Sequence, residues 1–238
     1  MRRTVIIILI LLSNVFTGQG QNSNQYYDLN LKKYDSQWYH FGFTLGIMKT
    51  DFKIDFNEEY INENIYNNEI NGIESKSTPG FNVGIVCDIK VFKNLNFRFI
   101  PSLTFTQRDL LFNTENGTKI TQIIENSNLD LPILFKYRSN RFQNIRPYLI
   151  FGGKFTYDMA SKEQVEDISI FKLKNIDYGI ELGFGIDIYL AYFKLCPEIK
   201  YFYGINNMMV NDASNTNTLS YNLEGLYSRS ILFSLTFE

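Results

Sequence analysis

Charged side chains recur within otherwise apolar segments of this sequence, and carboxylates gathered in one pocket could act as a general acid and base. Acids and bases are mixed in similar numbers, however, so they can also neutralise one another in a closed interior. We therefore predict a structural network of ion pairs rather than a catalytic pair of carboxylates. Its predicted members are Asp88, Lys90, Arg98, Asp130, Lys136, Lys154, Asp177, Glu181, Asp187, Glu198 and Lys200.

The elements that would position these charges are strands. Segment 175–190 alternates between apolar residues and polar or small ones, a period of two that a helix cannot satisfy. This pattern is typical of a strand with lipid on one side and a crowded polar lumen on the other. The apolar face consists of Ile176, Tyr178, Ile180, Leu182, Phe184, Ile186, Ile188 and Leu190.

The same alternation recurs along the chain and predicts an all-β fold, an eight-stranded antiparallel transmembrane β-barrel. Mean hydropathy is only -0.17, which fits a barrel because one face of every strand is polar. The remaining predicted strands are 38–49, 81–91, 96–109, 128–138, 146–158, 193–205 and 227–237.

Connection lengths alternate in step with these strands. Long polar segments follow every second strand, and short links follow the others. Short periplasmic turns and four long extracellular loops are the asymmetry of an outer-membrane barrel, so both termini are predicted in the periplasm. The long segments are 50–79, 110–127, 159–174 and 206–226.

Aromatic residues fall into two groups, as expected for rings that prefer the two membrane–water interfaces. One predicted girdle, at the periplasmic rim, consists of Tyr39, Phe97, Tyr137, Tyr148, Tyr192, Phe193 and Phe237. The other, at the outer rim, consists of Phe81, Phe105, Tyr157, Tyr178, Tyr201, Tyr203 and Tyr227.

The interior of an eight-stranded barrel is just wide enough to be filled by its own side chains. Unpaired charges there are costly, which favours the ion-pair network, and a filled lumen excludes a protein-conducting pore. The single histidine, His40, is predicted to face the lower lumen as a structural residue, far from the outer rim where barrel enzymes hold their catalytic group. We therefore predict no enzymatic activity, no cofactor or metal, and no small-molecule substrate.

The two cysteines, Cys87 and Cys196, fall on different faces of distant predicted strands. An exported protein would normally oxidise a nearby pair, so we predict two free thiols. Net charge is -2, which offers no basic surface for a nucleic-acid partner.

The N-terminal region has the charged, apolar, then small-residue order of a secretory signal. We predict a cleaved signal peptide at 1–20, a periplasmic leader at 21–37 and the barrel at 38–238. The leader could be a contact arm or a disordered segment, and its polar composition favours disorder.

Several motifs resemble PorT-type proteins, outer-membrane barrels of the type IX secretion system. The first strand contributes Tyr39-His40-Phe41-Gly42-Phe43, and the most specific match runs from Asp177-Tyr178-Gly179 through Tyr192-Phe193-Lys194 to Pro197-Glu198. Further matches are Leu129-Asp130-Leu131-Pro132, Arg146-Pro147-Tyr148 with Gly152-Gly153, and Asp158-Met159-Ala160-Ser161-Lys162.

This resemblance implies a part in exporting cargo proteins to the cell surface, in systems that also support gliding motility. Together with a filled lumen it implies an accessory or scaffold subunit rather than the conduit. The implied partners are outer-membrane lipid and other type IX secretion components. Two alternatives stay open: a stand-alone surface receptor or adhesin that uses the extracellular loops, and a solute porin.

Overall fold

The computed structural model describes residues 29–56, 70–114, 119–159, 173–209 and 223–238. Within these ranges no helix is long and apolar enough to cross a membrane. A short 3-10 helix, η1 (Tyr34–Ser36), precedes the strands. These are β1 (Tyr39–Phe56), β2 (Ile70–Ser77), β3 (Pro79–Lys90), β4 (Leu95–Phe99), β5 (Ser102–Thr114), β6 (Lys119–Arg138), β7 (Ile145–Asp158), β8 (Ile176–Tyr189), β9 (Lys194–Gly204) and β10 (Leu223–Phe237).

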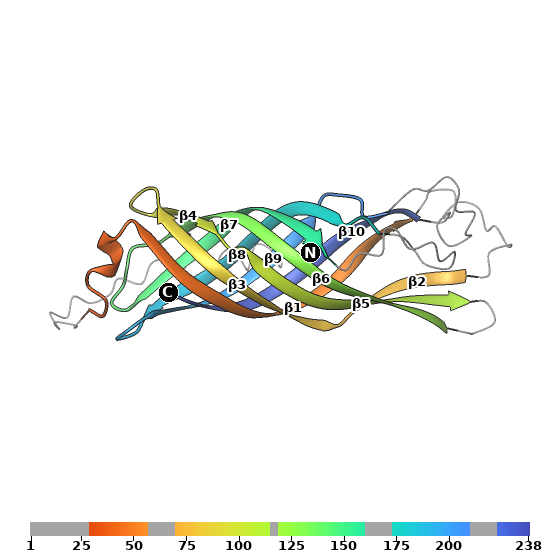
Figure 1. Ribbon diagram of the computed structural model, residues 1–238, viewed down its shortest axis with the longest axis horizontal. Coiled ribbons are helices and arrows are strands. Elements are labelled where there is room, and N and C mark those ends of the chain that lie inside the picture. Colours follow the sequence, from red (N-terminus) through yellow and green to blue (C-terminus); the bar gives the residue numbers. More distant parts are fainter. Residues whose placement is uncertain (1–28, 57–69, 115–118, 160–172, 210–222) are drawn as a thin grey trace, which may run out of the picture.

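All strands pair antiparallel, and the sheet closes on itself because β1 pairs with both β10 and β3. β2 and β3 are separated only by Thr78 and form one crossing of the wall. β4 and β5 form another, since both pair with β3 on one side and β6 on the other. The ring therefore has eight strands, which confirms the predicted fold class (Figure 1).

The crossing predicted at 96–109 is interrupted at Ile100 and Pro101, between β4 and β5. Proline has no N–H to donate to a neighbouring strand, so it breaks the ladder locally. Its carbonyl still accepts a hydrogen bond from the Ile85 amide at 3.0 Å. The barrel wall thus stays continuous past the interruption.

The structure has two different ends (Figure 1). At the turn end, short connections join β3 to β4, β6 to β7 and β8 to β9, and η1 and Glu238 lie beside them. At the opposite loop end, β2, β5 and β6 continue past the closed ring.

Several predicted loop boundaries are wrong, because the strands run further at the loop end. β1 continues to Phe56, and β5 and β6 pair out to Asn113 opposite Lys119, so most of the predicted loop 110–127 is a β-hairpin. Within 110–127 apolar and polar residues no longer alternate, and in 51–56 they alternate in the opposite phase, with the apolar side chain of Phe52 buried on the inward side. The period-two signal of a strand with one face in lipid therefore ends before the strands do. The loops predicted at 159–174 and 206–226 lie mostly outside the described residues.

Exposure alternates along the strands as predicted. In β7 and β8, residues that face lipid are exposed and those between them are buried. The most exposed aromatic side chains of the described residues lie at the turn end, where Trp38, Phe92, Phe142 and Tyr192 have exposed fractions of 65%, 67%, 69% and 93%. These rings suit a membrane–water interface.

One member of the predicted girdle is misplaced. Tyr148 points into the lumen and is only 4% exposed. Its neighbour Leu149 faces lipid, so alternation requires Tyr148 to point inward. Its hydroxyl donates a hydrogen bond to Glu198 at 2.7 Å, which satisfies the polar group inside the barrel.

Both cysteines are free, as predicted. Cys87 lies on the lipid-facing side of β3, whereas Cys196 is fully buried in the lumen on β9. The Cys196 thiol lies 3.0 Å from the Asp187 carboxylate, to which it donates.

Candidate functional site

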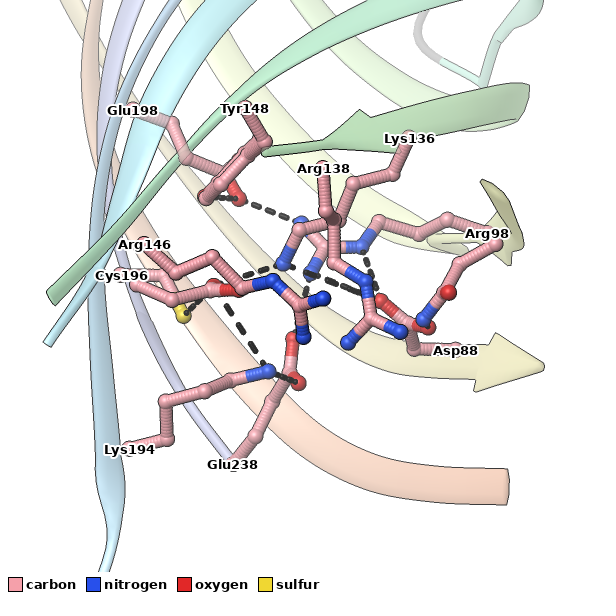
Figure 2. Close-up of polar contacts among 12 residues, drawn as sticks. Asp88, Arg98, Lys136, Arg138, Arg146, Tyr148, Lys194, Cys196, Glu198 and Glu238 are labelled. Carbon is pink, nitrogen blue, oxygen red and sulfur yellow. Dashed lines mark hydrogen bonds and ion pairs between the residues drawn. The ribbon is translucent and has the colours of Figure 1, made fainter. Parts of the chain in front are cut away.

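Arg98 of β4 is the centre of the charge network in the half of the lumen nearer the turn end (Figure 2). Its guanidinium pairs with Asp88 at 2.9 Å and Glu238 at 2.6 Å, and it also contacts Glu198. All four side chains are fully buried. The planar guanidinium can donate to several carboxylates at once, so one buried cation holds β3, β4, β9 and the residue after β10 together.

A second set of contacts joins this centre to β6 and β8. The Lys136 ammonium lies 2.7 Å from the Asp187 carboxylate and 3.8 Å from the centre of the Tyr148 ring. Lys194 pairs with Glu238 at 2.5 Å and with Asp187 at 3.6 Å. Cations and carboxylates therefore alternate across the lumen, as Figure 2 shows.

The ion pairs among the predicted charges nearer the loop end are longer than those of Arg98, although the hydrogen bonds are not. Asp130 accepts hydrogen bonds from Thr104 and Thr156, each at 2.7 Å. Lys154 lies 4.0 Å from Asp130 and 3.8 Å from Glu181. Lys200 pairs with Glu198 at 3.1 Å, which links this region to the Arg98 cluster.

Lys90 and Asp177, two predicted members of the charge network, lie away from the Arg98 centre. The Lys90 ammonium donates to the backbone carbonyl of Asp35 at 2.8 Å, at the mouth of the turn end rather than in the lumen. Asp177 is 5% exposed and lines a cavity near the loop end, together with Asp130 and Lys154. That cavity has a volume of about 20 Å³, which is room for about one water molecule.

An apolar layer that was not predicted from the sequence lies within the lumen. Val86, Ile100, Leu134 and Ile150 pack with Tyr148 and Cys196, all buried. The period-two pattern could have predicted it, because Val86, Leu134 and Ile150 are apolar residues at inward positions of their strands. A polar lumen was expected at these positions. The layer excludes water from the middle of the barrel, so the charged clusters interact in a medium of low dielectric constant.

The described part of the leader, 29–37, folds back onto the turn end, which contradicts its predicted disorder. The Tyr34 ring stacks on His40 with centroids 3.7 Å apart, and its hydroxyl donates to Glu238 at 2.8 Å. His40 faces inward, as predicted. Burial, together with the negative charge of Glu238, raises the pKa of the Tyr34 hydroxyl well above its ordinary value, so the group stays protonated and able to donate.

Asp35 anchors the same segment through arginines that were not predicted as members of the charge network. Its carboxylate lies 2.9 Å from Arg146, 3.5 Å from Arg141 and 3.7 Å from Arg138. The Tyr189 hydroxyl donates to it at 3.1 Å. We call Arg138, Arg141, Arg146 and Tyr189 the mouth cluster.

Comparison with known proteins decides the family. The model of a family described as "Outer membrane protein beta-barrel domain" matches residues 18–210. The chain belongs to this family. This outer-membrane barrel protein accordingly lies in the Gram-negative outer membrane, in contact with its lipid. No curated protein matches the chain.

Solved structures of small outer-membrane proteins are similar to this barrel. OprG from Pseudomonas aeruginosa is 14% identical, with a TM-score of 0.47 over 84% of this chain and 93% of OprG. Neisserial surface protein A is 10% identical, with a TM-score of 0.44 over 84% and 98%. Ail from Yersinia pestis, in complex with the heparin analogue sucrose octasulfate, is 9% identical, with a TM-score of 0.39 over 84% and 98%.

The arrangement in the lumen is suited to holding the barrel closed. In the parts of the chain that the structure describes, no three His, Cys, Asp or Glu residues gather as they would around a metal ion. The buried carboxylates at the centre, Asp88, Asp187, Glu198 and Glu238, each contact a cation. Such pairing stabilises ionised carboxylates inside a barrel.

The inward–outward alternation of strand residues could have predicted two arginines of the mouth cluster. Arg138 continues the inward series of Leu134 and Lys136 on β6, and Arg146 precedes inward Tyr148 on β7 by two residues. The positions of Tyr34 and Asp35 carried no such signal. They lie in a polar segment outside the strands, and their partners come from β1, β6, β7, β8 and the residue after β10.

Proposed function

We propose that this outer-membrane barrel is a surface receptor or adhesin that binds its partner with the strands projecting from the loop end. The observation that carries this proposal is the length of those strands. β6 has 20 residues and β1 has 18, whereas a transmembrane strand needs only about 9–11. About half of β6 is therefore available outside the bilayer.

The projecting strands form a paired surface. β5 pairs with β6 as far as Asn113 opposite Lys119, and with β2 as far as Thr114 opposite Ile70. A three-stranded sheet held by main-chain hydrogen bonds is pre-organised, so a partner would lose little conformational entropy by ordering it.

The filled lumen supports binding rather than transport or catalysis. The charged clusters and the apolar layer occupy the centre of the barrel, and the described cavity near the loop end holds about 20 Å³. The proposal includes no enzymatic activity, because His40 stacks under Tyr34 at the opposite end and the central carboxylates contact cations.

A second candidate is an accessory subunit of type IX secretion. The resemblance of the block from Asp177 to Glu198 to PorT-type proteins supports it, and so does a leader segment that docks at the periplasmic mouth. In this role the barrel would contact other secretion components and would not carry cargo itself.

Shortening the β5–β6 hairpin tests the first candidate. Replacing residues 108–124 with Asn-Gly keeps the last retained pair, Gln107 opposite Glu125, and supplies a two-residue turn. Outer-membrane vesicles that carry either form are then applied to glycan and protein arrays. We expect the shortened form to lose at least about tenfold in affinity for components that the full chain binds, about 1.4 kcal/mol.

The matched control replaces only residues 115–118 with Asn-Gly-Asn-Gly, which leaves the paired strands intact, and should keep array binding. Equal binding by the shortened form would exclude the hairpin as the receptor surface. The secretion candidate makes a different prediction: deleting the gene reduces export of many unrelated proteins, and normal export would exclude it.

A further inference from the structure

The three arginines of the mouth cluster carry more positive charge than the carboxylate of Asp35 neutralises. In the described ranges, Asp35 supplies the sole carboxylate within 4.0 Å of the Arg138, Arg141 and Arg146 guanidiniums. Arg138 is 2% exposed, and its Nε atom is buried without a hydrogen-bond acceptor. A buried guanidinium with an unused donor is costly, so this site favours an anionic ligand.

Side chains at the turn end also form hydrogen bonds with the backbone of residues 29–37, the segment that carries Asp35. Arg141 donates to the carbonyl of Asn30 at 2.5 Å, and Lys90 donates to the carbonyl of Asp35 at 2.8 Å. The Asn30 amide donates to Asn144 Oδ1 at 3.0 Å. Contacts to main-chain N–H and carbonyl groups are features by which a peptide is recognised, and a free anion would not use them.

A third part of the site recognises an aromatic side chain. The Tyr34 ring stacks on His40 with an angle of 3° between the planes, and the Lys194 ammonium lies 4.5 Å from its centroid. Tyr189 contacts the same ring edge-on at 5.9 Å. His40, Lys194 and Tyr189 come from different strands, so the closed barrel builds this ring site before the leader docks.

We propose that the turn-end mouth is a peptide-binding site for a short segment in which an aromatic residue is followed directly by an acidic one. Residues 29–37 occupy the site in cis, and a periplasmic partner with the same aromatic–acidic motif occupies it in trans when the leader is released. This site lies at the opposite end of the barrel from the strands that project at the loop end, and the proposal does not depend on their binding a partner.

The test uses the full chain with its own motif weakened by Tyr34→Ala and Asp35→Asn. The probe is a fluorescent synthetic peptide with the sequence of residues 29–37, titrated onto folded protein in detergent and followed by anisotropy. A tethered segment competes at an effective concentration of about 1 mM. For a dissociation constant of about 10 μM, the ratio of these two values predicts that the wild-type chain binds the peptide about 100-fold more weakly than the double variant does.

Two controls test whether binding depends on the Asp35 carboxylate of the peptide and on Arg146 of the barrel. A peptide with Asn in place of Asp35, and a triple variant that adds Arg146→Gln, should each lose most of the binding. Binding should also weaken at about 0.5 M salt, where charges are screened within a few ångströms. If the double variant does not assemble, as judged by its heat-modifiable migration on a gel, Asp35→Asn alone takes its place.

Failure of a folded variant to bind the peptide would overturn the proposal, and so would equal binding of the Asn-substituted peptide. Either result would make the docked leader a structural cap. Selective binding that depends on Asp35 and Arg146 would support a peptide receptor.

Discussion

The Arg98→Leu substitution is expected to lower the free energy of unfolding by about 3–5 kcal/mol, because it removes the one cation that three buried carboxylates share. Asp88, Glu198 and Glu238 all contact the lost guanidinium and are fully buried. Leucine fills some of the volume but supplies no positive charge. The measurement is urea unfolding in lipid vesicles, followed by the fluorescence of Trp38, the one tryptophan in the sequence.

Lys53→Leu is the matched control, since it removes the cation of an exposed ion pair. Lys53 lies 2.9 Å from Asp55, and both side chains are more than a third exposed. We expect this change to cost no more than about 1 kcal/mol. Arg98→Lys should fall between the two, because an ammonium keeps the charge but not the planar set of donors. Equal losses for Arg98→Leu and Lys53→Leu would show that the network does not stabilise the barrel.

Gly152→Ala is the second substitution expected to have a large effect. A Cβ atom built at Gly152 would lie 2.8 Å from the Cα of Leu134 on β6, and it would also meet the Ile133 carbonyl. Backbone cannot move aside as a flexible side chain can, so the two strands must separate locally. We expect a loss of about 1–3 kcal/mol or more, measured in the same unfolding experiment.

Gly153→Ala supplies the control on the adjacent residue. Gly153 faces lipid, and the nearest atom to its added Cβ is the Gly179 carbonyl oxygen at 3.8 Å, an ordinary contact. This substitution should leave stability unchanged or raise it slightly, because alanine restricts the unfolded chain more than glycine does. If the two alanine variants were equally stable, close approach of β6 and β7 would not be the reason for glycine at 152.

The period-two pattern predicted the part of the fold that depends on the membrane. Wherever one face meets lipid, apolar and polar residues must alternate, so the number of crossings and the inward phase of Arg98, Lys136 and Glu198 could be read directly. Above the membrane both faces meet water and the constraint disappears. This is why β6 was predicted to begin at about residue 128, although it starts at Lys119.

The details of the site depended on contacts that no local pattern encodes. Glu238 follows the last strand, yet it reaches into the lumen to meet Arg98 and Lys194. Asp35 lies in a polar segment whose composition predicted disorder, yet arginines distant in sequence fix its position. Such pairings follow from closure of the ring, which brings residues 29–37 and Glu238 together at one rim.

Conductance across planar lipid bilayers tests the central claim, that the barrel is filled by its own side chains and acts at its two ends. The full chain, shown to be inserted by its heat-modifiable migration, should give no discrete current steps under an applied voltage. Reproducible ohmic steps from the purified wild-type chain would contradict a filled lumen, and would favour a solute pore over a binding protein.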